Sequence, residues 1–166
     1  MKVNDGKTQL ICVSSAATSV VDSFVEINGK VIPILDTIKI LGFIIDKEGG
    51  MASHIKHITR KVYMRNLDDN SPEKADVADL DLTVAYSTIL RPIIEYASQL
   101  YHSMLTSEQS QKIEGLQRRA LRIITGPGTS FQAALEILGL GKLSERRIKL
   151  CQKFALKTEN DPRYNH

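Results

Sequence analysis

Residues 116–126 read Leu116-Gln117-Arg118-Arg119-Ala120-Leu121-Arg122-Ile123-Ile124-Thr125-Gly126 and place apolar and basic side chains at helical spacing. Upstream, Thr106 and Gln109 form a capping-box pair, which predicts a helix over residues 107–125 that ends at Gly126-Pro127-Gly128. The predicted buried stripe of this helix consists of Ile113, Leu116, Ala120, Ile123 and Ile124, and the basic residues outside it are Lys112, Arg118, Arg119 and Arg122.

Before this helix, residues 91–97 read Arg91-Pro92-Ile93-Ile94-Glu95-Tyr96-Ala97 inside a longer helical pattern. The pattern predicts a helix from about residue 81 to residue 104, bent near Pro92 because proline lacks an amide donor and clashes with the preceding turn. An earlier helix is predicted over residues 53–67. The acidic, proline-containing stretch 68–81 breaks the helical pattern between the two.

After residue 126, two further helices are predicted. Ser130 should cap a short helix that reaches Leu138, and Ser144 should cap a final helix that reaches about Thr158. The final helix should turn Ile148, Cys151 and Phe154/Ala155 inward, and it carries a ridge of Arg146, Lys149, Lys153 and Lys157.

The first 46 residues have the composition of strands. Asn28-Gly29 lies between the β-branched segments 23–27 and 30–34, which predicts a hairpin with a type I′ turn. Residues 37–46 read as another strand, in which Gly42 marks a bulge or a close backbone approach. Such short strands without a covering helix are typical of the edge of a larger sheet, so the fold class is α+β, with a small antiparallel β part followed by an all-α bundle.

The chain therefore divides into three predicted parts: a β part over residues 1–46, a helical part over residues 51–158 with its acidic break at 68–81, and a frayed tail over 159–166. Hydrophobic residues make up 42% and charged residues 25%, which is ordinary for a globular protein. No apolar run is long enough to span a bilayer and no secretory signal is visible. We expect an intracellular protein, in the nucleus or cytoplasm and not secreted, with Cys12 and Cys151 reduced.

Positive charge is concentrated in the last third of the chain. Residues 1–111 hold 11 Lys and Arg against 14 Asp and Glu, whereas residues 112–166 hold 11 against 5. This asymmetry favours a polyanionic partner for the last third. A solvated basic helix surface explains it equally well.

Residues that could carry metal chemistry are few. Asp68-Asp69 lies in the acidic stretch, with no hydrophobic strand before it, and reads as loop charge. His54 and His57 share a helix face but no third ligand follows at suitable spacing, so an amphipathic helix surface is the favoured interpretation. We therefore predict no metal site in this chain.

Several segments resemble, in chain order, the reverse transcriptases of non-LTR (LINE-like) retrotransposons. Residues 4–8, Asn-Asp-Gly-Lys-Thr, resemble the Lys-Thr turn of motif D, and residues 40–46 resemble motif E, the primer grip. The segments 91–97 and 116–126 resemble the thumb of that family, and residues 143–147 resemble the Leu-x-x-Arg-Arg pattern near its end. The resemblance covers most of residues 2–158.

The resemblance implies a palm edge followed by a thumb that binds a hybrid of RNA template and DNA primer. Lys7 would lie near the phosphates of the incoming nucleotide, and Leu41, Gly42 and Phe43 would support the primer 3′ end. The residues expected to contact phosphates are Arg118, Arg119, Arg122, Arg146 and Lys149. Plain surface charge or an intrachain ion pair is the alternative for each of these five.

The catalytic aspartates of the family belong upstream of Asn4, in a palm and fingers region that this sequence lacks. Magnesium is therefore expected for the full-length family enzyme and not for this chain, whose own enzymatic activity stays open. We predict a reverse transcriptase fragment that is inactive alone. The alternatives are a non-catalytic nucleic-acid-binding helical module, formed by residues 82–158, and a protein-interaction or relic domain.

Overall fold

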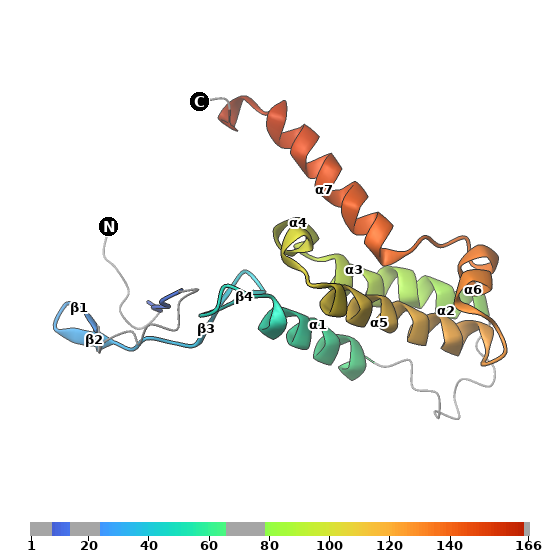
Figure 1. Ribbon diagram of the computed structural model, residues 1–166, viewed down its shortest axis with the longest axis horizontal. Coiled ribbons are helices and arrows are strands. Elements are labelled where there is room, and N and C mark those ends of the chain that lie inside the picture. The colour runs from blue at the N-terminus through green and yellow to red at the C-terminus, as the bar shows by residue number, and fades with distance from the viewer. Residues whose placement is uncertain (1–7, 14–23, 66–78, 165–166) are drawn as a thin grey trace. The chain divides into compact units, whose positions relative to one another are not determined.

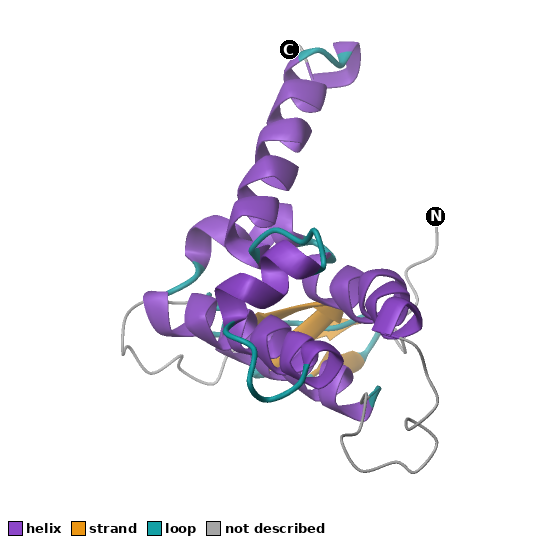
Figure 2. Cartoon of the chain, turned by 90° about the vertical axis from the view of Figure 1, so that its right-hand side faces the viewer, coloured by secondary structure: helices purple, strands orange, loops and turns teal. Residues whose placement is uncertain are grey.

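The computed structural model describes residues 8–13, 24–65 and 79–164. The described part has the predicted α+β composition, with two small antiparallel hairpins followed by helices (Figure 1). Figure 2 distinguishes the short strands from the helices by colour. The chain forms two compact units, Met1–His57 and Ile58–His166. Lys7, Asp68-Asp69 and most of the acidic break lie outside the described residues.

The first hairpin confirms the prediction made from Asn28-Gly29. Strand β1 (Val25–Ile27) pairs antiparallel with β2 (Lys30–Ile32), so that Ile27 lies opposite Lys30. Both turn residues have positive φ, 52° at Asn28 and 76° at Gly29, as a type I′ turn requires.

The segment 37–46, predicted as one strand, is a second hairpin. Strand β3 (Thr37–Ile40) pairs with β4 (Phe43–Asp46), and Leu41-Gly42 forms the two-residue turn with φ of 50° and 90°. Gly42 therefore marks a turn and not a bulge. The prediction was wrong because β-branched residues continue on both sides of the turn and leucine is not a residue that favours turns.

The helix predicted over residues 81–104 consists of several shorter pieces. Helix α2 (Asp79–Ala85) continues into the π-helical turn η3 (Tyr86–Leu90) and then into α3 (Arg91–Glu95). The N–H of Arg91 bonds to the carbonyl of Tyr86, and this wider turn leaves room for the ring of Pro92. The chain breaks instead at Ala97, whose φ is 56°, and resumes as α4 (Ser98–Tyr101) and η4 (His102–Met104).

The later helices begin largely as predicted, except the last. The Thr106–Gln109 capping box starts α5 (Ser107–Thr125), and Ser130 caps α6 (Phe131–Ile137). Helix α7 (Leu143–Glu159) begins one residue before Ser144, with no side-chain cap. A short turn, η5 (Pro162–Tyr164), follows where the sequence suggests a frayed tail.

The core of the helical unit differs from the predicted stripes at several positions. Gln117 and Leu121 of α5 are buried, whereas Ile123 is only half-buried. On α7, Ile148 and Phe154 were expected to face inward but are 44% and 53% exposed. The periodicity of α7 is correct, but its packing against α4, η4 and α5 leaves these two side chains uncovered.

Across the described ranges, no helix has both the length and the apolar character that a membrane span demands.

The turn after α5 yields a first prediction. Gly126→Ala should lower the free energy of unfolding by about 1–3 kcal/mol, because φ of 85° and ψ of 166° define a region that is essentially restricted to glycine. Gly128→Ala, where no atom lies within 4 Å of an added Cβ, should change it by less than about 0.5 kcal/mol. Denaturant unfolding followed by circular dichroism measures both; equal losses would contradict this explanation.

Candidate nucleic-acid interface

Three of the predicted phosphate-binding residues, Arg118, Arg119 and Arg122, lie on the exposed side of α5. Leu116, Gln117, Ala120 and Leu121 of the same helix are buried, so helical spacing keeps the three arginines outside the core. Among the ion pairs of the described residues, none involves these arginines. Their charge is not neutralised within that part of the chain and can attract an anion.

Aromatic rings support two of these arginines. The guanidinium carbon of Arg118 lies 5.1 Å from the ring centroid of Phe131, and that of Arg119 lies 5.2 Å from the ring centroid of Tyr63. Stacking uses the face of a guanidinium, whereas its N–H donors point outward from its edge. An arginine held in this way can still donate hydrogen bonds to a phosphate. It also loses less side-chain conformational entropy on binding.

A small hollow beside Arg119 is not a ligand pocket. It has a volume of about 20 Å³ and is lined by residues of α1 (Ala52–Met64), η3 and α5, including Val62, Leu90 and Ile123. Ligand pockets typically measure about 300–1,000 Å³.

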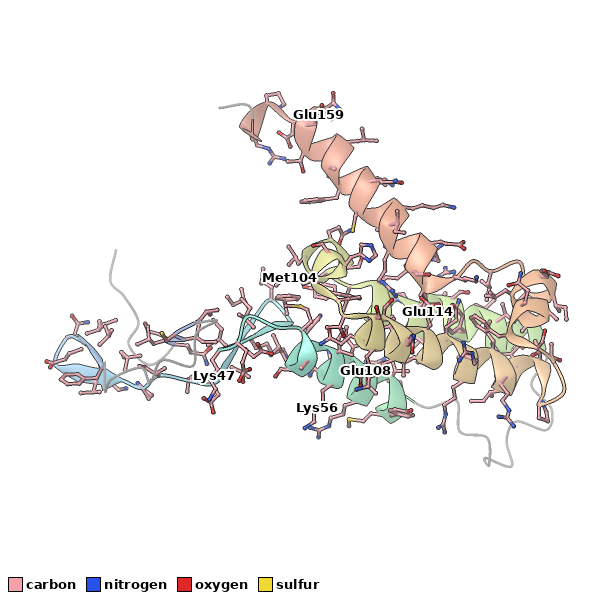
Figure 3. All side chains as sticks on the ribbon, viewed as in Figure 1. Lys47, Lys56, Met104, Glu108, Glu114 and Glu159 are labelled. Atoms are coloured by element: carbon pink, nitrogen blue, oxygen red, sulfur yellow. The ribbon has the colours of Figure 1, made fainter. Side chains whose placement is uncertain are left out.

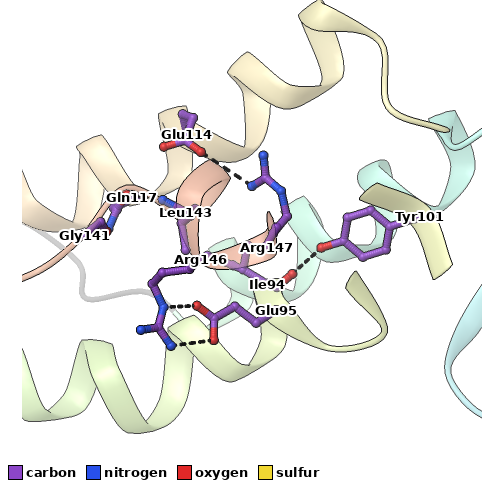
Figure 4. Close-up of polar contacts among 9 residues, drawn as sticks. All are labelled: Ile94, Glu95, Tyr101, Glu114, Gln117, Gly141, Leu143, Arg146 and Arg147. Atoms are coloured by element: carbon purple, nitrogen blue, oxygen red, sulfur yellow. Dashed lines mark hydrogen bonds and ion pairs between the residues drawn. The ribbon is translucent and has the colours of Figure 1, made fainter. Parts of the chain in front are cut away.

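Arg146, another predicted phosphate contact, is occupied by an intrachain ion pair. Its Nη2 donates to Oε2 of Glu95 at 3.1 Å, and its Nε donates to Oε1 of the same carboxylate (Figure 4). These hydrogen bonds from Arg146 to Glu95 raise the pKa of Arg146 above its ordinary value. Arg146 thus has the alternative role given above, an intrachain ion pair, because its guanidinium donors already bind the Glu95 carboxylate.

Arg147, which the sequence did not single out, is the most deeply buried charge among the described residues of the helical unit. Its side chain is 0% exposed; Nη1 lies 3.5 Å from Oε1 of Glu114, and Nη2 donates to Oγ of Ser110 at 3.0 Å. Its position in α7, four residues after buried Leu143 and four before Cys151, places it on the inward stripe. That spacing could have predicted the burial of Arg147, but fully buried arginines are rare, so it was not expected.

Gln117 connects α5 to the start of α7. Its Nε2 donates to the carbonyl of Gly141 at 3.0 Å, and its Oε1 accepts from the N–H of Leu143 at 3.2 Å. Nearby, the hydroxyl of Tyr101 donates to the carbonyl of Ile94, and burial raises the pKa of Tyr101 to about 12. Segment 143–147 thus contacts segment 116–126 through Gln117 and segment 91–97 through the Arg146–Glu95 pair.

Lys149, the last predicted phosphate contact, is exposed on α7. Lys153 and Lys157 follow it at four-residue steps and are also exposed. Residues four apart are neighbours on a helix surface, so the three ammonium groups form one row and repel one another. An anionic partner would relieve that repulsion.

The predicted primer-grip residues form the tip of the second hairpin, in the other compact unit: Leu41 and Gly42 are the turn, and Phe43 is the first residue after it. Leu41 is 87% exposed and has positive φ, an unusual combination for a leucine. His54, only 1% exposed, supports the hairpin: its Nδ1 accepts from the N–H of Ile44 at 3.4 Å, and its ring packs 4.4 Å from that of Phe43. His54 is thus not the surface residue that we expected.

Asp46, at the end of the hairpin, is 3% exposed and accepts a hydrogen bond from the N–H of Gly50 at 2.8 Å. Its backbone carbonyl also accepts from the N–H of Gly49 at 3.0 Å. The aspartate therefore shapes the turn that leads from β4 into α1. This contact gives a structural reason for an aspartate at the end of the segment that resembles motif E.

Within residues 8–13, 24–65 and 79–164, no group of three or more His, Cys, Asp or Glu is placed to hold a metal ion. The described residues thus do not fit the pair of magnesium ions that the resemblance implies for the full-length enzymes, and we derive no chemical step through such ions.

No family model, curated protein or solved structure matches this chain.

The buried pair yields a second prediction. Glu114→Leu should lower the free energy of unfolding by about 3 kcal/mol, because it leaves the guanidinium of Arg147 buried without a counter-charge. Adding Arg147→Met should recover most of this loss, since two apolar side chains then replace the pair. Thermal and denaturant unfolding of both single variants and of the double variant measure the coupling; strictly additive effects would contradict a direct interaction.

Proposed function

We propose that this chain is the palm-edge and thumb part of a reverse transcriptase of the non-LTR retrotransposon type, and that it binds a hybrid of RNA template and DNA primer. The observation that carries the proposal is the exposed Leu41 at the tip of a supported hairpin, within the segment that resembles motif E. Metal-dependent nucleotidyl transfer is assigned to carboxylates outside this chain, and Lys7 keeps its proposed place near the incoming nucleotide. Such a protein would act in the nucleus or the cytoplasm.

The comparison of the two hairpins supports a function for Leu41. Both turns have two residues with positive φ, but one uses Asn28 and the other uses Leu41 at the first position. Leucine in the left-handed region costs about 1–2 kcal/mol, and its exposed side chain gains little from burial. Backbone strain of this kind is concentrated at functional sites, where a particular side chain must be presented.

The hybrid is the partner that best matches the charged residues of α5. An RNA–DNA duplex presents regularly spaced phosphates and a shape that a protein recognises without reading bases. Arg118, Arg119 and Arg122 offer planar donors along one helix face, and such donors match phosphate oxygens. Lys149 on α7 adds a further contact, whereas Arg146 is reserved for Glu95.

A second candidate function is a nucleic-acid-binding helical module without any role at a primer end. The compact unit Ile58–His166 favours it, because that unit contains all five predicted phosphate contacts. The two candidates differ in whether the hairpin tip at Leu41 affects binding, and this difference can be measured.

For the arginines of α5, we expect salt-dependent binding of an RNA–DNA hybrid. Replacing Arg118, Arg119 and Arg122 with glutamine should reduce the slope of log K against log salt by about one for each phosphate that is no longer neutralised. Lys112→Gln is the matched control on the same helix, because Lys112 already pairs with Glu108 at 2.9 Å. Fluorescence anisotropy over a salt series measures the slopes; an unchanged slope in the triple variant would exclude α5 from the interface.

For the hairpin, we expect Leu41→Asn to raise the stability of the protein by about 1 kcal/mol, because asparagine tolerates positive φ. The same variant should bind a hybrid with a free primer 3′ end several-fold more weakly, yet bind a hybrid whose ends are closed by loops unchanged. Asn28→Leu is the reciprocal control, which should lose stability but keep the preference for a primer end. Equal binding of both hybrids by the wild-type protein would favour the module without a primer-end role.

A further inference from the structure

Helix α7 changes its environment halfway along its length. Leu143 and Arg147, at its start, are completely buried against the bundle. Phe154 lies on the same side of the helix, seven residues or two turns after Arg147, but is 53% exposed. The inward-facing stripe of α7 therefore continues into its outer half without being covered.

Exposed apolar side chains also occur on the elements that α7 packs against. Helix α7 packs against α4 and η4, where Leu100 and Met104 are 56% and 49% exposed. Figure 3 labels Met104 beside α4 and Glu159 at the outer end of α7. Exposed apolar side chains on elements in contact favour an interaction site in this region.

The charges beside the stripe are all positive. With 3.6 residues per turn, Lys153 and Lys157 lie along one edge of the stripe that contains Phe154, whereas Lys149 lies farther round the helix. The two acidic residues of α7, Glu145 and Glu159, lie on the opposite side of the helix. A partner that covers Phe154 would thus meet lysines along this edge and would be favoured by acidic side chains.

We propose that the outer half of α7, together with Leu100 and Met104, binds an acidic amphipathic helix of a partner protein. The apolar face of such a helix would cover Phe154, and its flanking carboxylates would pair with Lys153 and Lys157. Pairing with α7 of a second copy is disfavoured, because it would bring two rows of lysines together. This proposal does not depend on the binding of a hybrid by α5.

The test uses the full chain and a labelled peptide of about 18 residues, or five helical turns, with leucine at helical spacing and glutamate elsewhere. A peptide of identical composition but permuted order, without an apolar face, is the control for charge alone. Anisotropy titrations should show that the wild-type protein binds the amphipathic peptide at least about tenfold more tightly than the permuted one.

Two variants of α7 separate the apolar stripe from general charge. Phe154→Glu should weaken binding of the amphipathic peptide at least about tenfold, because a ring that the peptide would cover is replaced by a carboxylate that repels the glutamates of the peptide. Leu156→Glu adds the same charge two residues away, at a side chain that is 61% exposed on another face, and should weaken binding less than about threefold. Both side chains are more exposed than buried, so circular dichroism should show that both variants fold.

A charge-swap variant keeps the proposal testable if Phe154→Glu fails to fold. Lys153→Glu with Lys157→Glu should weaken binding of the glutamate peptide and strengthen binding of a lysine peptide with the same apolar pattern. Absence of binding to the amphipathic peptide, or equal losses in the Phe154 and Leu156 variants, would overturn the proposal. Tighter binding of a single-stranded oligouridylate that depends on Phe154 would overturn it as well, in favour of base stacking.

Discussion

The helical unit depends on the burial of one charge that cannot be removed. A guanidinium stays protonated at any pH at which proteins fold, so Arg147 must find compensation inside the bundle, and it does so at Glu114 and Ser110. This requirement fixes α7 against α5 at a single register, because a shift of one residue would expose the charge and bury a different side chain. The side-chain amide of Gln117 stabilises the same junction, because it bonds to the backbone of Gly141 and Leu143.

With its beginning fixed in this way, α7 does not need contacts along its whole length. Arg146 adds an ion pair with Glu95 on the outer side of the junction, and beyond Cys151 most of the side chains are exposed. Segment 143–147 therefore serves first to assemble the bundle, through its contacts with segments 91–97 and 116–126. Their polar residues contact one another, which leaves the arginines of α5 and the lysines of α7 for external partners.

The sequence predicts those features that depend on a few neighbouring residues. Such features are the Asn28-Gly29 turn, the Thr106–Gln109 capping box and the Ser130 cap. In each, the residues themselves supply the hydrogen bonds or the backbone conformation that the structure needs. Features without a clear local signal were missed: the turn at Leu41, the π-helical turn before Pro92, and the start of α7 at Leu143, whose N–H donates to a side chain 26 positions away. The exposure of Phe154 was missed for the same reason. Periodicity shows which side of a helix is apolar but not how far neighbouring elements cover that side.

The two positively charged surfaces of the helical unit differ in what accompanies the charge. On α5, the guanidinium groups of Arg118 and Arg119 lie over the rings of Phe131 and Tyr63, and their edges suit phosphate oxygens. On α7, lysines flank a phenylalanine ring that is half uncovered. A compact ammonium on a flexible stem gives little geometric selection of phosphate, and an exposed ring gains most from apolar contact. The chemistry of the two surfaces therefore argues for different partners: a nucleic-acid backbone at α5 and an acidic protein helix at α7.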